Sequence, residues 1–335
     1  MPTTEQLLHA EPLDPDGPAP VRARGYWELV WLRFRRDRAA LASIGFIVLL
    51  VLACFPGAWI AQKLLGHGPD DLFFDGVDDR LIPLGPWSYV TNPETGSRDL
   101  LVLGADSALG RDEFLRLLYG GRVSLQVAVM STAGVMFIGT LLGAIAGYYR
   151  GWIDTIISRV TEITMAFPAL LFIIALASTI GSRLDNVTFG IFGRGVVTLV
   201  LVFVMFGWFY PCRIIRAQVL SLREKEFIEA ARMIGASDWR IIRSHLLPHL
   251  VAPIIVFSTL IVAGYILGEA GLSFLGLGIK LPTASWGNLL SSAPEYYTLQ
   301  PWLMLWPGLA VLATTLAFNL LGDGLRDAFD PRSTL

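Results

Sequence analysis

The chain has 335 residues, of which 54% are hydrophobic and only 16% are charged, and its formal net charge is -2. A soluble domain carries about 25% charged residues, so the composition argues against a soluble protein, and the charge gives no support for nucleic-acid binding. Its two cysteines, Cys54 and Cys212, lie in or beside apolar runs, which argues against a disulfide framework. The composition therefore predicts a membrane protein of the all-α class.

The N-terminal residues divide into two parts. Residues 1–25 are rich in Pro, Asp and Glu and have no hydrophobic periodicity, which predicts a disordered cytoplasmic tail. In residues 26–38, Trp27, Trp31 and Phe34 recur at helical spacing among arginines, which predicts an interfacial helix in contact with membrane lipid. A basic flank without structure of its own fits this second pattern equally well.

Six uncharged runs are candidates for membrane-spanning helices. A helix needs about 20 apolar residues to cross a hydrocarbon core of about 30 Å, because its backbone groups must bond internally there. The runs cover residues 39–62, 123–149, 163–182, 195–212, 250–268 and 296–322. The fourth run is the shortest, but the arginines at its two ends have side chains long enough to reach the interfaces. The sequence thus predicts a polytopic protein with six transmembrane helices.

The distribution of Lys and Arg sets the orientation. If the N-terminus is cytoplasmic, 17 of the 26 Lys and Arg residues lie in inner segments, which satisfies the positive-inside rule and places both termini in the cytoplasm. The expected order after the interfacial helix is a first transmembrane helix (39–65), an extracytoplasmic segment (66–121), a core with five transmembrane helices (122–322) that includes a cytoplasmic loop (213–249), and a cytoplasmic C-terminal tail (323–335).

The cytoplasmic loop has the signals of two helices and a turn. Residues 221–234 contain good helix formers, and Gly235 follows where a left-handed residue can end a helix. Ser237 or Asp238 can cap the next helix, and Pro248 marks entry to the fifth span. The pattern predicts two short helices joined by a sharp turn, held close to the membrane face.

The motifs of this loop resemble a known family. Glu229-Ala230-Ala231, then three residues, then Gly235, and Leu247-Pro248 about a dozen residues later resemble the signature loop of importer-type ABC permeases. The stretches 109–112, 269–278 and 319–331 are similar, in the same order, to the C-type permeases of the dipeptide and oligopeptide (peptide/nickel) importers. This resemblance implies the six-helix architecture of a type I ABC importer permease in the bacterial inner membrane.

The resemblance also implies which residues couple the chain to its partners. In the family, the first loop helix docks into a groove on an ATPase subunit, so Ala230 and Ala231 are expected to allow close approach and Glu229 to accept hydrogen bonds. Trp239, Arg240 and Arg243 are expected to anchor the second helix. The full set of expected coupling residues is Glu229, Ala230, Ala231, Gly235, Trp239, Arg240 and Pro248.

The resemblance implies four kinds of partner and a function. The partners are a second permease subunit of the B type, two ABC ATPase subunits that bind ATP and Mg, an extracytoplasmic substrate-binding protein, and membrane lipid. The substrates of the family are di- and oligopeptides, with nickel complexes and oligosaccharides as alternatives of the same architecture. No cofactor is expected in this chain.

The sequence lacks the motifs of ATP hydrolysis and of a metal site, which agrees with a permease subunit. The sequence has no Gly-x-x-x-x-Gly-Lys-[Ser/Thr] phosphate loop, so the chain is expected not to be an enzyme and to depend on ATP hydrolysed elsewhere. His245 and His249 lie four residues apart without a third ligand, so no metal site is expected. A self-sufficient secondary transporter is the alternative of another class, but it needs charged relays in its spans, and these are nearly uncharged.

Glu269 and three glycines stand out within the spans. Glu269 is an acid near the outer end of the fifth span, where it can line the gate or pair with a cation of a partner subunit. A wetted interfacial acid that caps the next segment is an equal alternative. Gly139, Gly143 and Gly147 lie four residues apart on one face of the second helix and are expected to serve helix packing.

The extracytoplasmic segment is the least predictable part of the chain. No fold is predicted for residues 66–100. Their acidic cluster is expected to be a solvated face rather than a binding site for basic groups. The cluster comprises Asp70, Asp71, Asp75, Asp78 and Asp79.

Overall fold

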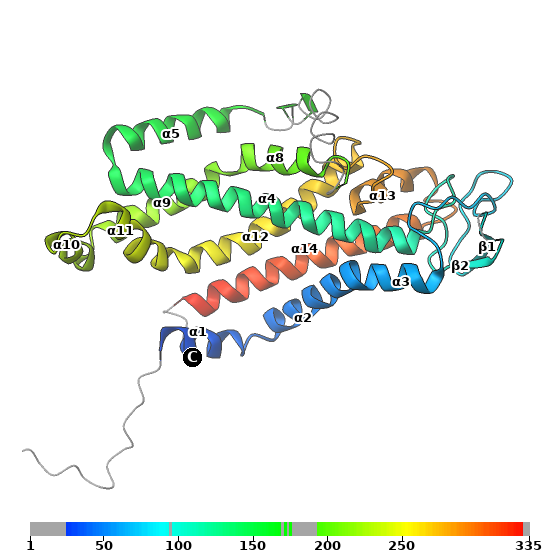
Figure 1. Ribbon diagram of the computed structural model, residues 1–335, viewed down its shortest axis with the longest axis horizontal. Helices are drawn as coiled ribbons and strands as arrows, with labels where there is room; N and C mark the ends of the chain where they lie inside the picture. The colour runs from blue at the N-terminus through cyan, green and yellow to red at the C-terminus, as the bar shows by residue number, and fades with distance from the viewer. Residues whose placement is uncertain (1–24, 94–95, 169–170, 173, 176–192, 331–335) are drawn as a thin grey trace, which may run out of the picture.

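The computed structural model describes residues 25–93, 96–168, 171–172, 174–175 and 193–330 of the chain. Long helices run beside one another along the longest axis, as Figure 1 shows. Two short helices, α10 (Glu226–Met233) and α11 (Asp238–Ile241), lie at one end of this bundle and a β-hairpin lies at the other. We call these the loop end and the hairpin end. The all-α class is confirmed, with the hairpin as its one addition among the described residues.

Helix α1 (Tyr26–Phe34) opens the described chain at the loop end. Its Val30 and Phe34 are buried against helix α14, whereas Trp27 and Trp31 are each 58% exposed. The predicted helix is therefore present, with one apolar face packed inward and a tryptophan face turned outward.

The first span is one continuous rod with a local defect. It runs through helix α2 (Arg38–Leu52), a π-turn (Ala53–Gly57) and helix α3 (Ala58–Leu65). Asp37 caps its start by accepting from the backbone N–H groups of Ala39 and Ala40. Pro56 lies in the π-turn, where the wider backbone accommodates a residue that has no N–H to donate.

Helix α4 (Glu113–Tyr149) spans 37 residues and begins well before the predicted position 123. Asp112 caps it, with its carboxylate accepting from Leu115 N at 2.9 Å. The helix thus begins within the expected extracytoplasmic segment 66–121, and the boundary of that segment with the membrane stays a prediction. The first turns carry charged side chains that are buried against the preceding segment, so they are helical although they are not apolar.

The third and fourth spans differ from their predicted runs. Helix α5 (Gly151–Ala166) begins before residue 163, and half of the predicted run 163–182 lies outside the described residues. The fourth consists of helix α8 (Val196–Gly207) and helix α9 (Phe209–Arg223), which are bent by 41° relative to each other. Pro211 explains the bend, because it lacks the N–H that would bond the carbonyl of Gly207.

The loop end contains helix α10 (Glu226–Met233) and helix α11 (Asp238–Ile241). Helix α9 reaches Arg223, so the predicted helix over 221–234 is in fact interrupted before Glu226. Helix α11 continues through a π-turn (Ile242–Leu246) into helix α12 (Leu247–Phe274), and Pro248 lies in the first turn of α12. The second loop helix and the fifth span are therefore one element.

The chain ends with helix α13 (Trp286–Ser292), a 3-10 turn (Ala293–Glu295) and helix α14 (Trp302–Phe329). A Ser285–Asn288 capping box starts α13. Helix α14 continues to Phe329 within the predicted C-terminal tail, and its Leu325 and Ala328 pack against α1. The cytoplasmic location of that tail stays a prediction. Within the described ranges, four continuous helices are long and apolar enough to cross a membrane, or five if the bent α8–α9 pair counts as one span.

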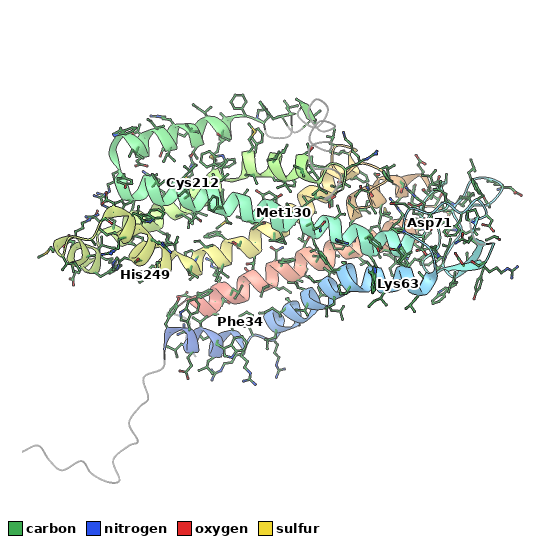
Figure 2. All side chains as sticks on the ribbon, viewed as in Figure 1. Phe34, Lys63, Asp71, Met130, Cys212 and His249 are labelled. Atoms are coloured by element: carbon green, nitrogen blue, oxygen red, sulfur yellow. The ribbon has the colours of Figure 1, made fainter. Side chains whose placement is uncertain are left out.

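The hairpin end is built from residues 66–112, which we call the hairpin segment. Strand β1 (Ser88–Thr91) pairs antiparallel with strand β2 (Arg98–Leu101). A small apolar core under the hairpin comprises Phe73, Val90, Leu101 and Ala105. Figure 2 labels Asp71 at the hairpin end and His249 at the loop end, on opposite sides of the helix bundle.

Candidate functional site

The turn between α10 and α11 has the geometry of a Schellman motif. Gly235 has a φ of +81°, the N–H of Ala236 donates to Ala231 O at 3.0 Å, and the N–H of Gly235 donates to Arg232 O at 2.9 Å. A residue with a Cβ adopts this left-handed conformation only with strain. The turn that was predicted at Gly235 is confirmed.

The two loop helices bury one face and expose another. Ile228 and Ala231 pack with Ile241 in a core that also includes residues of α4, α9 and α12. In contrast, Met233 and Ile234 are 88% and 86% exposed, next to the turn. Large apolar side chains that protrude together from a folded loop are typical of a surface that another protein covers.

The expected coupling residues fall into two groups. Glu229, Ala230, Gly235, Arg240 and Pro248 are exposed, as is Trp239. Ala231 is only 4% exposed and faces the chain's own core, so the expectation that it approaches a partner is wrong.

Trp239 does not anchor the second loop helix within this chain, because its side chain is 65% exposed. Ile241 and Ile242 take the inward positions instead. Residues two apart lie about 200° apart around a helix, so burying Ile241 turns Trp239 outward. Trp239 therefore joins the exposed apolar surface beside Met233 and Ile234.

Tyr148 connects α4 to both loop helices, and sequence reasoning missed it. Its hydroxyl donates to Asp238 Oδ1 at 2.7 Å, and the guanidinium of Arg232 lies 5.4 Å from its ring centroid. Its backbone carbonyl also accepts from Arg223. Tyr148 is 4% exposed, so one buried side chain contacts α10 and α11 at the point where α4 ends.

The three glycines of α4 face helix α9. A Cβ at Gly139 would lie 2.9 Å from Trp208 O, one at Gly143 would lie 2.6 Å from Cys212 O, and one at Gly147 would lie 2.9 Å from Arg216 O. These distances are shorter than a carbon–oxygen contact permits, so only glycine fits. The backbones of α4 and α9 therefore lie in close contact along several turns.

Ion pairs tie α5 to α9 and α4 near the loop end. The guanidinium of Arg216 donates to both carboxylate oxygens of Asp154, at 2.5 and 2.6 Å. Arg150, between α4 and α5, donates to Glu224 Oε1 at 2.6 Å. Helices α4, α5 and α9 are thus connected through polar side chains beside the loop helices.

Glu269 lies in a closed polar site near the hairpin end. It is fully buried, and its carboxylate accepts from Ser124 Oγ at 2.6 Å and from Ser273 Oγ at 2.7 Å. The interpretation as a wetted interfacial acid is wrong. In this structure Glu269 also neither lines an open gate nor reaches the surface toward a partner, because α4, α12 and α13 enclose it.

A second buried polar group fixes the hairpin segment to α4. His67 Nε2 lies 2.9 Å from Asp112 Oδ2, and His67 Nδ1 lies 3.3 Å from Asp99 Oδ2. Burial lowers the pKa of His67, but the hydrogen bond to Asp112 and the charges of Asp112 and Asp99 outweigh it and leave the pKa raised above its usual value. The His67 ring therefore joins the hairpin to the cap of α4, and the two carboxylates beside it favour its protonated form.

Arg116 completes this attachment. Its Nε lies 2.7 Å from Asp106 Oδ2, and its Nη1 donates to Asp70 Oδ1 at 2.7 Å and to Pro282 O at 3.2 Å. Arg111 donates to the same Asp106 carboxylate. The expectation that the acidic cluster is only a solvated face is wrong for Asp70, which is paired with the buried Arg116.

Metal and cofactor sites were not expected in this chain. In the described part of the chain, no three His, Cys, Asp or Glu side chains come together in a way that would hold a metal ion. His245 lies in the π-turn before α12, and His249 lies in the first turn of α12. The ring of His249 packs on the ring of Phe227, with their centroids 5.1 Å apart.

Comparison with known proteins gives consistent matches over nearly the whole chain. Residues 139–335 match the family described as the binding-protein-dependent transport system inner membrane component. Residues 25–81 match the N-terminal TM domain of oligopeptide transport permease C.

Three relatives illustrate the similarity. The glutathione transport system permease protein of Pectobacterium atrosepticum is 39% identical over 307 residues, covering 91% of this chain and 91% of the relative. The corresponding protein of Escherichia coli O157:H7 is 37% identical over 333 residues, covering 98% and 96%. The dipeptide transport system permease protein of Alkalihalophilus pseudofirmus is 44% identical over 224 residues, covering 67% and 69%.

Proposed function

The chain belongs to the family of inner-membrane components of binding-protein-dependent transport systems, and from this premise we propose that it is the permease subunit of an ABC importer for peptides. The names of its relatives support peptides as the substrate class, because they are permeases of glutathione and dipeptide systems. Glutathione is itself a small peptide, so both names describe the same chemistry.

The exposed apolar surface of the loop end is the observation that carries this proposal. Met233, Ile234 and Trp239 are exposed beside the turn at Gly235. Glu229 is exposed on α10, the helix that also carries Met233. Such a surface suits a groove on an ATPase subunit. Two such ATPases, a second permease subunit and an extracytoplasmic substrate-binding protein complete the proposed transporter, and ATP and Mg are bound by the ATPases.

The orientation follows from this assignment. The loop end faces the cytoplasm, where 17 of the 26 Lys and Arg residues are expected. Helix α1 and the end of α14 lie at the same end of the bundle, which supports cytoplasmic termini (Figure 1). The hairpin end then faces outward, toward the substrate-binding protein.

The contacts of Tyr148 give a route for the motion. Closure of the ATPases moves α10 and α11, and the Tyr148–Asp238 hydrogen bond and the Arg232 contact pass that movement to α4. Helix α4 is closely packed on α9, so the two helices move together. The bundle thereby alternates between outward-facing and inward-facing states, and this chain itself performs no hydrolysis.

The test is a pair of substitutions in the loop. Glu229→Lys places a cation in the docking surface, and Gly235→Pro removes the N–H and the left-handed backbone that form the turn. We expect both to abolish uptake of a radiolabelled dipeptide in cells that carry the complete transporter. The amount of subunit in the membrane should stay unchanged.

The matched control is Asp79→Lys, which makes the same charge reversal on an exposed residue of the hairpin segment. It should transport like the wild type. Normal uptake by the two loop variants at wild-type subunit levels would contradict the coupling assignment.

A further inference from the structure

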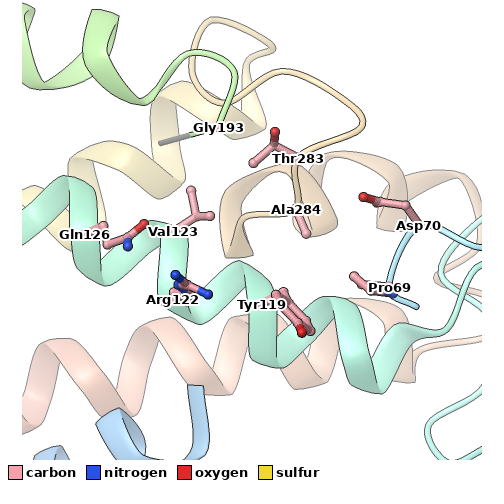
Figure 3. Close-up of a pocket in the computed structure, with 9 residues that line it drawn as sticks. All are labelled: Pro69, Asp70, Tyr119, Arg122, Val123, Gln126, Gly193, Thr283 and Ala284. Carbon is pink, nitrogen blue, oxygen red and sulfur yellow. The ribbon is translucent and has the colours of Figure 1, made fainter. Parts of the chain in front are cut away.

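A cavity of about 260 Å³ lies near the hairpin end of α4. Helix α4 supplies Tyr119, Arg122 and Gln126 along one wall, while Asp70 and Thr283 lie on the other side, as Figure 3 shows. Pockets that enclose a whole ligand measure about 300–1,000 Å³. This cavity is therefore sized for one end of a ligand rather than for all of it.

The charged groups of this cavity are not balanced. Asp70 is already paired with Arg116 at 2.7 Å, and the Tyr119 hydroxyl donates to Gln62. Arg122 is exposed, and among the described residues neither it nor Gln126 has a hydrogen-bond or ion-pair partner. The uncompensated charge of the cavity is thus positive.

Arg122 is also held in place and isolated along the helix. Its guanidinium lies 5.5 Å from the ring centroid of Phe55, a contact that orients the side chain without neutralising it. The rest of α4, residues 123–149, contains no charged side chain. Arg122 is therefore the last cation on this helix before the long apolar stretch.

We propose that Arg122 binds a carboxylate of the transported peptide in this cavity, with the Gln126 amide as an additional hydrogen-bond donor. The guanidinium fork matches a carboxylate with two parallel hydrogen bonds. The cavity lies at the end of the bundle that the proposed function places outward, so the contact acts as the peptide enters from the binding protein. This inference rests on the proposed peptide import and adds the chemical group that the permease recognises.

The experiment compares Arg122→Gln and Arg122→Lys in the complete transporter reconstituted in liposomes. Initial uptake rates are measured at low concentration for alanyl-alanine and for its C-terminal amide, each relative to the wild type. The binding protein is the same in every sample, so its own selectivity cancels in these ratios. Arg98→Gln, which removes an exposed positive charge from β2, is the matched control.

We expect Arg122→Gln to lower uptake of alanyl-alanine by about tenfold or more, because a hydrogen bond to a charged group is lost. Uptake of the amide should fall much less, Arg122→Lys should restore much of the rate with alanyl-alanine, and Arg98→Gln should behave like the wild type. Arg122→Lys keeps the positive charge but not the guanidinium shape. Its rate with alanyl-alanine alone therefore shows whether the charge of residue 122 is what the peptide requires.

Other outcomes overturn the inference in distinguishable ways. An unchanged rate in Arg122→Gln, or equal losses for the acid and the amide, excludes a carboxylate site. If equal losses accompany weaker copurification of anionic lipid, Arg122 serves a lipid headgroup instead. Failure of the wild type to take up alanyl-alanine contradicts the proposed peptide import itself.

Discussion

The side chains around the two ends of helix α4 differ in burial and in polarity. At the hairpin end, charged groups are buried and paired within the chain, as Arg116 is with Asp106 and His67 with Asp112. At the loop end, large apolar side chains such as Met233 and Ile234 stay exposed. Buried charged groups of the hairpin end thus find partners within this subunit, whereas the loop end presents apolar side chains that another protein can cover.

This difference has a mechanical consequence. Helix α4 has 37 residues, so at 1.5 Å per residue it is about 55 Å long. The hairpin segment holds its first turns through Asp112 and Arg116, and the loop helices contact its last turn through Tyr148. A force applied at the loop end therefore acts on a rod whose other end is fixed to the hairpin segment.

The largest expected effect comes from breaking the hairpin end. Arg116→Met leaves the buried Asp106 carboxylate with Arg111 as its remaining ion-pair partner and removes the contacts to Asp70 and Pro282. Breaking a buried ion pair from one side costs about 3–5 kcal/mol, so we expect a large fall in the unfolding temperature of the purified transporter. Arg80→Met, at an exposed arginine of the same segment, should leave that temperature unchanged. Equal stability of the two variants would mean that the buried pairs do not fix the segment.

The next effect tests whether the rod between the ends is closely packed. At Gly143 an added Cβ would lie 2.6 Å from Cys212 O, so Gly143→Ala must push α4 and α9 apart. Overpacking of this kind costs about 1–3 kcal/mol, measurable as a lower unfolding temperature. Gly264→Ala is the control, because nothing lies within 4 Å of a Cβ at that helical position. A stable Gly143→Ala variant would show that the two helices can separate without cost.

The sequence predicted this architecture where a local rule was sufficient. Run lengths without charge located the first, fifth and sixth spans, and the left-handed preference of glycine located the turn at Gly235. The rule failed at the start of α4, because Glu113 and Arg116 are charged and yet buried by a segment whose fold had not been predicted. Apolar runs cannot locate a boundary that tertiary ion pairs determine.

At the candidate site, too, the sequence predicted positions that follow from a local motif and missed those that depend on tertiary contacts. The exposed positions of Glu229 and Arg240 agree with what the motif suggested, but the inward turn of Ala231 depends on the core beneath α10. Tyr148 was missed because its partner Asp238 is 90 residues away in the chain. One serine partner of Glu269, Ser124, lies 145 residues away in α4, so no spacing in the sequence indicates it, whereas Ser273 is four residues further along the same helix.

A smaller effect is expected at the junction of rod and loop. Tyr148→Phe removes the hydroxyl that donates to Asp238 while keeping the ring between the loop helices. One hydrogen bond contributes about 1 kcal/mol, so stability should change little, while the uptake of dipeptide per ATP hydrolysed should fall. Tyr149→Phe, at the adjacent and exposed tyrosine, is the control and should leave this ratio unchanged. An unchanged ratio in Tyr148→Phe would remove Tyr148 from the proposed route.

The smallest effect concerns pH at the hairpin end. The pKa of His67 is raised in the folded chain, above its ordinary value of 6.5, so the fold binds this proton more tightly than the unfolded chain does. The stabilisation is therefore complete below pH 6.5 and is lost as the pH rises through the folded-state pKa. We therefore expect the unfolding temperature to fall as the pH rises above 6.5, and His67→Gln to flatten that part of the profile. His249→Gln, at the loop end, should keep the wild-type profile, because His249 packs on Phe227 and lies far from the buried aspartates. If His67→Gln kept the wild-type slope, the pH dependence would not come from His67, and the His67–Asp112 pair would not be a protonated contact.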